Sequence, residues 1–289
     1  MTTNKLPLVI AYGGGINSTA MLCGFRERDI KPDLILFADT KGEFERTYRH
    51  KDEMSALCQL WWGIEIQTVR KLYEGEHEGL EAECRRKNIL PSLAYGTKAC
   101  SVKHKIEPQT KALKAWMDAN KIKSVTRAVG YHAGEGHRAV GIQSEDLKKG
   151  RTAHNWFPLI EWQWRQADCL EAIKRHGLTP PGKSACFFCP ASKRHEIIAL
   201  KQDRPDLYER AIAMERNLSR GPRSVKRAVG VDDQGGTVYG EALEMPRVLG
   251  LAMGVSWEEI TAADENQAKL FDWVDEHAAT TIPCGCFDV

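Results

Sequence analysis

Two close pairs of cysteines are the residues whose types and spacing most directly suggest chemistry. Cys186 and Cys189 are separated by two residues and followed by Pro190, and Cys284 and Cys286 are separated by one residue. The chain contains nine cysteines, an odd number, and its first residues form no secretory signal pattern, so we expect reduced thiols rather than disulfides. Closely spaced thiols in such a chain indicate a metal, cluster or redox site.

A glycine-rich loop is the second feature with chemical potential. It contains three glycines and three polar residues that we assign to cofactor binding, namely Gly13, Gly14, Gly15, Asn17, Ser18 and Thr19. A loop between a strand and a helix can surround an anion with backbone N–H groups at the positive end of the helix dipole, and glycines let the main chain approach closely. The sequence matches neither the dinucleotide-binding fingerprint nor a Walker loop with its lysine. It therefore predicts a phosphate site of another kind.

Two carboxylates follow the next apolar run along the chain. Asp39 and Glu43 lie in a polar loop after residues 34–38. Because ligands bind beyond the carboxyl ends of the strands in parallel sheets, we expect both side chains to face the same crevice as the glycine loop. One of them would hold Mg²⁺ or a ribose, since Mg²⁺ in nucleotide sites is usually bound by one or two carboxylates and phosphate oxygens. Helix capping by both residues is the alternative.

Short apolar runs that alternate with helical patterns must position these residues. Strands are predicted at residues 7–12, 34–38, 64–69, 124–129 and 155–160, and helices at residues 18–28, 44–57, 107–120 and 165–176. Continuous apolar strands separated by helices predict an α/β, Rossmann-like fold, in which a parallel sheet carries helices on both faces. Its ligand site is expected beyond the carboxyl ends of the strands, where the glycine loop lies.

Composition and charge limit the class of protein that this chain can form. Of the 289 residues, 42% are hydrophobic, which excludes a disordered or fibrous chain. The net charge of +2 creates no overall electrostatic field that would indicate a nucleic acid or a membrane as partner. No apolar run approaches the roughly 20 residues that span a bilayer, so we expect a cytoplasmic protein without a membrane partner.

Pro180, Pro181 and Gly182 indicate a linker. We expect a nucleotide-binding domain at residues 1–180 and a mainly helical region at 181–289, which holds the cysteine site and a hairpin near residues 231–238.

Five segments in chain order resemble motifs of one enzyme superfamily, the PP-loop ATP pyrophosphatases and phosphoadenylylsulfate (PAPS) reductases. The matches are residues 13–18 with S-G-G-x-D-S, 37–43 with F-x-D-T-G-x-E, 98–108 with C-C-x-x-R-K-x-x-P, 130–138 with G-x-R-x-x-E-S-x-R and 156–162 with Y-P-L-x-x-W. The resemblance implies the adenine nucleotide alpha hydrolase-like fold, with ATP or another adenine nucleotide at the loop. Gly13, Asn17 and His132 replace the motifs' serine, aspartate and arginine, which leaves open whether ATP is cleaved or only bound.

The resemblance also implies a reaction. Members of the superfamily cleave ATP between its α- and β-phosphates to adenylylate a substrate, or reduce an already adenylylated sulfate. We assign catalysis to four residues of the matching segments, namely Lys103, Lys105, Glu135 and Arg138. Residues 216–227, from Arg216 to Arg227, carry five cations and no acid, which fits a polyanion. We therefore expect a transferase that activates a nucleotide or nucleic acid by adenylylation for sulfur transfer or modification, with a sulfur-donor protein as a further partner.

The resemblance extends to the cysteines. Cysteine-rich members pair a C-x-x-C with the two cysteines that align with Cys100 and Ser101, and this set holds a 4Fe-4S cluster. In this chain the candidate ligands are five cysteines, namely Cys100, Cys186, Cys189, Cys284 and Cys286. Zn²⁺ on the two close pairs is an equal alternative, and buried thiols or a redox pair are the third. Cys23, Cys58 and Cys169 lie among apolar residues at helical positions and are predicted to belong to the core.

Two other functions remain open. A PAPS reductase would draw electrons from thioredoxin, form sulfite and use a cysteine near the C-terminus in the motif E-C-G-x-H. The segment that contains Cys284 and Cys286 resembles this motif only loosely. A zinc-stapled module with a decayed nucleotide site would bind nucleic acid without nucleotide turnover. The sequence also leaves a homo-oligomer open.

Overall fold

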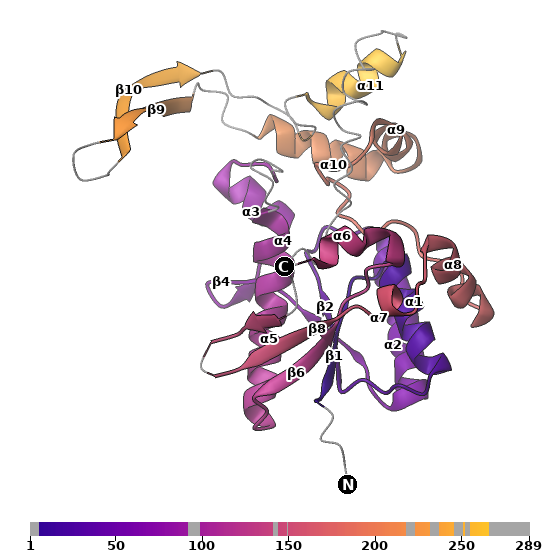
Figure 1. Cartoon of the computed structure of the whole chain (residues 1–289). Helices are drawn as coiled ribbons and strands as arrows, with labels where there is room; N and C mark the ends of the chain where they lie inside the picture. The colour runs from indigo at the N-terminus through magenta and orange to yellow at the C-terminus, as the bar shows by residue number, and fades with distance from the viewer. Residues whose placement is uncertain are drawn as a thin grey trace. The chain divides into compact units, whose positions relative to one another are not determined.

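The computed structural model describes most of the chain, and Figure 1 gives its course. The described residues are 6–91, 99–140, 144–148, 150–217, 223–231, 237–245, 251 and 255–265. They divide into two compact units, the first made of residues 6–83 and 99–187 and the second of residues 84–91 and those from 188 onward. The domain boundary expected at residue 180 stays a prediction. No helix in these ranges is long and apolar enough to cross a membrane.

A six-stranded sheet with the order β3-β2-β1-β6-β8-β7 forms the centre of the first unit. Its strands are β1 (Leu8–Tyr12), β2 (Leu34–Ala38), β3 (Ile66–Val69), β6 (Ser124–Ala128), β7 (Ser144–Asp146) and β8 (Thr152–Trp156). Five strands run parallel, and β7 pairs antiparallel with β8 at the edge. Every residue of β1 and β2 is buried, which explains why these two strands are continuous apolar runs.

Helices cover both faces of the sheet, as the sequence predicts. The helices α1 (Ile16–Glu27), α2 (Glu45–Trp62) and α8 (Gln166–Arg175) lie on one face, and α5 (Glu107–Ala119) lies on the other (Figure 1). Alternation along β1 separates the two cores, because Ile10 packs into the cluster that contains Met21 and Val9 into the cluster that contains Met117. The α/β fold class is therefore confirmed.

The predicted strand at residues 155–160 is wrong in its second half. The strand β8 ends at Trp156, and a short helix, α7 (Pro158–Glu161), follows it. Pro158 stands at the first turn of this helix, where its fixed φ is favourable and its missing N–H costs nothing. The residues after β6 form a 3-10 turn at Ala133–Glu135 and the helix α6 (Gly136–Ala139).

Shorter elements complete the first unit. They are β4 (Leu72–Tyr73), β5 (Glu76–His77), α4 (Ala99–Ser101) and a π-helical turn at Val102–Ile106 that leads directly into α5; α3 (Leu80–Lys87) runs on into the second unit. A π-helical turn inserted before an α-helix is rare and is often found at functional sites.

The described part of the second unit contains helices and one hairpin. Its elements are α9 (Arg194–Asp203), α10 (Pro205–Arg216), α11 (Trp257–Glu265), β9 (Arg223–Val231) and β10 (Thr237–Met245). The predicted hairpin is confirmed, because β9 and β10 pair antiparallel with Val231 opposite Thr237. Glu215 of α10 accepts hydrogen bonds from the backbone N–H groups of Leu251 and Trp257 at 2.6 and 3.1 Å, and burial raises its pKa.

Candidate functional site

The glycine loop joins the end of β1 to the start of α1. Gly15 is the N-cap of α1, and in the described part of the chain no side chain caps this helix and no acidic residue lies in its first turn. The positive end of the helix dipole is therefore left for an anion. Gly14 has a φ of +73°, and a Cβ there would lie 3.1 Å from Cγ2 of Thr47, so this position requires glycine.

A pocket of about 370 Å³ opens in front of this helix end. It is lined by the loop residues Gly13, Gly15, Asn17 and Ser18, by residues that follow β6, namely Gly130, Tyr131, His132, Glu135 and Arg138, and by Gly182, Lys183 and Ser184. The pocket lies beyond the carboxyl ends of β1 and β6, the place where parallel sheets bind their ligands. Its volume is in the range of small-molecule sites.

Glu135 joins the loop to the segment after β6. Its Oε2 accepts hydrogen bonds from Nδ2 of Asn17 at 2.8 Å and from the backbone N–H of His132 at 3.2 Å. Its Oε1 accepts a charge-assisted hydrogen bond from Arg138 at 2.5 Å. An aspartate at position 17 has no N–H to donate, so Asn17, which departs from the family motif, fits the carboxylate that faces it.

Aromatic stacking fixes Arg138 in the pocket wall. Its guanidinium carbon lies 4.2 Å from the centre of the Tyr131 ring, and this ring stacks on Phe157 with centres 5.6 Å apart. Gly130 lets this segment approach α1, because a Cβ there would lie 3.1 Å from the backbone nitrogen of Ser18. The predicted residues Glu135 and Arg138 therefore meet the predicted loop.

Asp39 is buried and does not line the pocket. The residue is 3% exposed, and its carboxylate accepts hydrogen bonds from the Tyr48 hydroxyl at 2.8 Å, the Lys41 N–H at 2.7 Å and Nε of Arg70 at 2.7 Å. Burial, together with the neighbouring Asp39 charge, raises the pKa of Tyr48, so its hydroxyl stays a donor.

Glu43 and Lys105 form a buried ion pair of 2.9 Å, and neither residue lines the pocket. Lys103, two residues earlier on the π-helical turn, is exposed. Thr19 is also outside the pocket, because its buried hydroxyl bonds with Tyr12 at 3.2 Å and with His50 at 3.0 Å. Of the predicted residues, Asn17, Ser18, Glu135 and Arg138 thus come together with the glycines.

Three residues with site-like surroundings are missing from the sequence-based prediction. Lys183 and Ser184 line the pocket although they follow the linker, and their short polar run next to the cysteines was the available signal. His104 is 1% exposed, and its Nε2 lies 2.5 Å from Glu83. Burial lowers the pKa of His104, and no motif reasoning distinguishes it from its lysine neighbours.

The described cysteines do not gather into a metal site. Cys186 is buried, and its thiol lies 3.1 Å from the Thr40 hydroxyl, while Cys100 is half-buried at α4. Within the described ranges, no three His, Cys, Asp or Glu side chains are arranged to hold a metal ion. Cys284 and Cys286 lie outside the described residues, so the predicted ligand set, Cys189 included, stays a prediction.

Three further thiols belong to the core, as predicted. Cys23, Cys58 and Cys169 are fully buried, and burial raises the pKa of each to about 12. Thiols in this state are poor nucleophiles and poor metal ligands.

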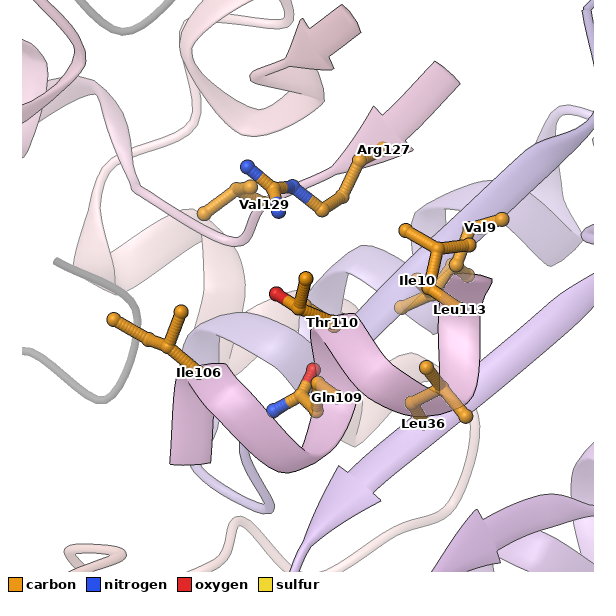
Figure 2. A pocket seen from close by; sticks show the side chains of 10 residues that line it. Val9, Ile10, Leu36, Ile106, Gln109, Thr110, Leu113, Arg127 and Val129 are labelled. Carbon is orange, nitrogen blue, oxygen red and sulfur yellow. The ribbon is translucent and has the colours of Figure 1, made fainter. Parts of the chain in front are cut away.

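A second, much smaller cavity lies between α5 and the sheet (Figure 2). Arg127 of β6 and Thr110 and Gln109 of α5 meet around it. Its volume of about 30 Å³ has room for about two water molecules. Among the described residues, Nε2 of Gln109 has no hydrogen-bond partner, so internal water suits this cavity better than a nucleotide.

Comparisons with known proteins place the chain in a family. The family model described as the phosphoadenosine phosphosulfate reductase domain matches residues 7–180. An uncharacterized protein of Methanocaldococcus jannaschii is 26% identical over an alignment of 232 residues, and the match covers 75% of this chain and 44% of that protein. The chain thus spans less than half the length of this relative.

Among solved structures, the U34-tRNA thiolase NcsA from Methanococcus maripaludis, with its 4Fe-4S cluster, matches 74% of this chain and 73% of its own. The sequences are 17% identical and the TM-score is 0.40. The family model, in contrast, covers more than half of the chain and includes the glycine loop, Glu135 and Arg138. The chain therefore belongs to the phosphoadenosine phosphosulfate reductase domain family.

Proposed function

We propose that the protein binds the phosphates of an adenine nucleotide at the glycine loop and activates a substrate by adenylylation, for sulfur transfer or modification of a nucleotide or nucleic acid. The observation that carries this proposal is the uncapped N-terminus of α1, which faces a pocket of about 370 Å³ lined by Arg138 and Lys183. Family membership supports the nucleotide. The basic residues from Arg216 to Arg227 support a polyanionic acceptor.

The proposed reaction needs little from the protein beyond positioning and charge. An acceptor oxygen attacks the α-phosphorus of ATP, the bond between this phosphorus and the α,β-bridging oxygen breaks, and pyrophosphate leaves. Backbone N–H groups of the loop and the guanidinium of Arg138 would stabilise the charge that develops on the leaving group. Glu135 holds Arg138 in place through the 2.5 Å contact.

The products formed from ATP test this proposal. Incubation with ATP labelled at its α-phosphate and a mixed nucleic-acid fraction should release pyrophosphate and transfer the label to the nucleic acid. Added sulfide should then displace the label as AMP, separated by chromatography, and no ADP should form. Gly14→Asp should abolish the release, because it adds a charge and a Cβ to the loop at a φ of +73°. Gly63→Asp is the matched control, since Gly63 has a φ of +72° and a Cβ there would meet no atom within 4 Å. Equal activity in Gly14→Asp and Gly63→Asp would reject the proposal.

A PAPS reductase is the second candidate, and the family description favours it. This reaction would reduce adenylylated sulfate to sulfite with electrons from a thioredoxin-like dithiol and would leave ATP unused. It would require Cys284 or Cys286 as the nucleophile. Sulfite formation that persists after both Cys284→Ser and Cys286→Ser would exclude this candidate.

The predicted cysteine site stays a proposal beside both functions. Anaerobic purification, an absorption spectrum and metal analysis distinguish a brown 4Fe-4S cluster from colourless zinc. Loss of the bound metal in Cys186→Ser and Cys284→Ser, with retention in Cys169→Ser, would support the proposed ligands. The core position of Cys169 makes it a suitable control.

A further inference from the structure

The carboxylates near the pocket are already engaged by cations. The three pairs are Asp39 with Arg70, Glu43 with Lys105 and Glu135 with Arg138. Of the described residues that line the pocket, only Glu135 carries a carboxylate, and its two oxygens are occupied by Arg138, Asn17 and the His132 N–H. Asp39 and Glu43, which the sequence suggested for Mg²⁺, do not line the pocket.

These residues do not fit a carboxylate-held Mg²⁺. Such an ion is usually bound through one or two carboxylates together with phosphate oxygens. To bind Mg²⁺ here, Glu135 would have to give up the hydrogen bonds from Asn17 and Arg138 that hold the pocket wall together. The loop itself offers an amide, Asn17, where the motif has an acid. Cationic side chains and backbone N–H groups must therefore neutralise the charge of the phosphates.

The segment from Gly182 to Phe187 brings another cation to the loop. The hydroxyl of Ser184 donates a hydrogen bond of 2.6 Å to the backbone oxygen of Gly13. Further along, the N–H of Phe187 donates to the backbone oxygen of Gly42 at 2.8 Å, and Cys186 forms a β-bridge with Glu43. The segment is thus tied to the loops after β1 and β2.

Lys183 lies within this tied segment, next to Ser184, and its exposed side chain lines the pocket. A lysine ammonium is a compact charge on a flexible stem, well suited to phosphate groups. Two cations and one carboxylate of the described residues line the pocket, and the carboxylate offsets Arg138. Lys183 thus adds a second cation, beside Arg138, to the wall that faces the start of α1.

We propose that Lys183 binds the nucleotide phosphates in this pocket together with Arg138, and that the site takes its nucleotide free of a protein-held divalent metal ion. The inference rests on the proposed nucleotide binding and names the form of the nucleotide, a metal-free polyphosphate. Ser184 is a positioning residue, because it acts through the loop carbonyl and the placement of its neighbour.

Calorimetric titration of the full chain with ATP and with adenosine, each in excess Mg²⁺ and in excess EDTA, tests this inference. The wild-type protein should bind ATP at least as tightly in EDTA as in Mg²⁺. Lys183→Ala should weaken ATP binding about tenfold, the loss of one charge-assisted hydrogen bond, and should leave adenosine binding unchanged. Lys183→Arg should restore most of the ATP affinity. Lys174→Ala, at an exposed position of α8, is the control.

Three results would overturn the inference while the proposed nucleotide binding stands. They are ATP binding that requires Mg²⁺, Lys183→Ala that binds ATP as tightly as the wild type, and an equal loss of ATP and adenosine affinity in Lys183→Ala. The last result would mean that Lys183 only supports the fold. A wild-type protein that binds adenosine and ATP in neither buffer would reject the proposed function itself.

Discussion

Asn17 and Glu135 form the contact in which this chain departs most clearly from the motif that it resembles. The side-chain amide of Asn17 donates a 2.8 Å hydrogen bond to a carboxylate that also receives Arg138. An aspartate at position 17 would place two negative charges at this distance. The substitution of amide for acid is thus matched to its partner, and it leaves the pocket less acidic.

Asn17→Asp should lower the free energy of unfolding by about 1 to 2 kcal/mol at neutral pH, through charge repulsion and the lost hydrogen bond. Adding Glu135→Gln to this variant should recover most of the loss, because an amide then faces the new acid. Urea unfolding of the wild type, both single variants and the double variant gives the coupling free energy. Strictly additive single effects would show that the two side chains do not interact.

Lys105 and Lys103 provide a second comparison at the scale of single residues. Lys105→Ala leaves the buried carboxylate of Glu43 without its 2.9 Å partner and should cost about 3 kcal/mol in unfolding free energy. Lys103→Ala, at the exposed neighbouring position, should stay within about 0.5 kcal/mol of the wild type. Similar losses in the two variants, measured by urea unfolding, would contradict the buried pair.

At this scale, the sequence predicts residue types better than their surroundings. Glu135 and Arg138 were predictable because they match the acidic and basic positions of a family motif, and both line the pocket. Thr19 and Lys103 could not be separated from their neighbours, because which side of a helical turn faces a pocket depends on packing. Lys183 escaped prediction because it reaches the loop from more than a hundred residues away in the chain.

The loop between β1 and α1 is the element on which the proposed site depends. The last two of its three glycines differ in conformation. Gly14 has a φ of +73°, and Gly15 has the extended backbone of an N-cap with a φ of −103°. Only the first conformation is unfavourable for residues with a Cβ. The glycine pattern in the sequence therefore contains one strict requirement and one position that is more tolerant.

Gly14→Ala should destabilise the protein by about 1 to 2 kcal/mol, because the new Cβ meets both the positive φ and Cγ2 of Thr47 at 3.1 Å. Gly15→Ala places its Cβ 3.6 Å from Cβ of Ser184, an ordinary contact, and should change stability by less than about 0.5 kcal/mol. Thermal and urea unfolding of the two variants test the difference. A larger loss in Gly15→Ala would mean that the loop has another conformation.

Secondary structure was predictable wherever the pattern alone decides it. The buried strands β1 and β2 are apolar throughout, so their extents follow from the sequence. The end of β8 was not predictable from apolar residues, because the apolar run continues past Pro158 into α7. The π-helical turn at Val102–Ile106, which contains the buried residues His104 and Lys105, has no sequence signature.

Across the whole molecule, buried histidines link stability to pH. Burial lowers the pKa of His50 and of His104 below 6.5, even though Glu53 and Glu83 act in the opposite direction. The unfolded chain therefore binds more protons than the folded one near and below that pH, so the free energy of unfolding falls as the pH falls.

The predicted decline lies below about pH 7, with a slope of up to about 1.4 kcal/mol per pH unit for each histidine. His104→Gln should flatten this decline, whereas His77→Gln, at an exposed position, should leave it unchanged. Urea unfolding over a pH series measures both slopes. Stability that rises as the pH falls, or an equal effect of the two substitutions, would contradict a lowered pKa of His104.

The proposed function depends on the pocket as a whole, in which the loop at the start of α1 would bind the phosphates of an adenine nucleotide. Calorimetric titration with ATP of the wild type, Gly14→Asp and Gly63→Asp tests it most directly, because the two glycines share a positive φ and only Gly14 lies in the loop. The wild type and Gly63→Asp should each bind one ATP per chain, and Gly14→Asp should show no measurable binding. Wild-type protein that binds no ATP, or ATP binding that survives in Gly14→Asp, would contradict the proposed phosphate site at this loop.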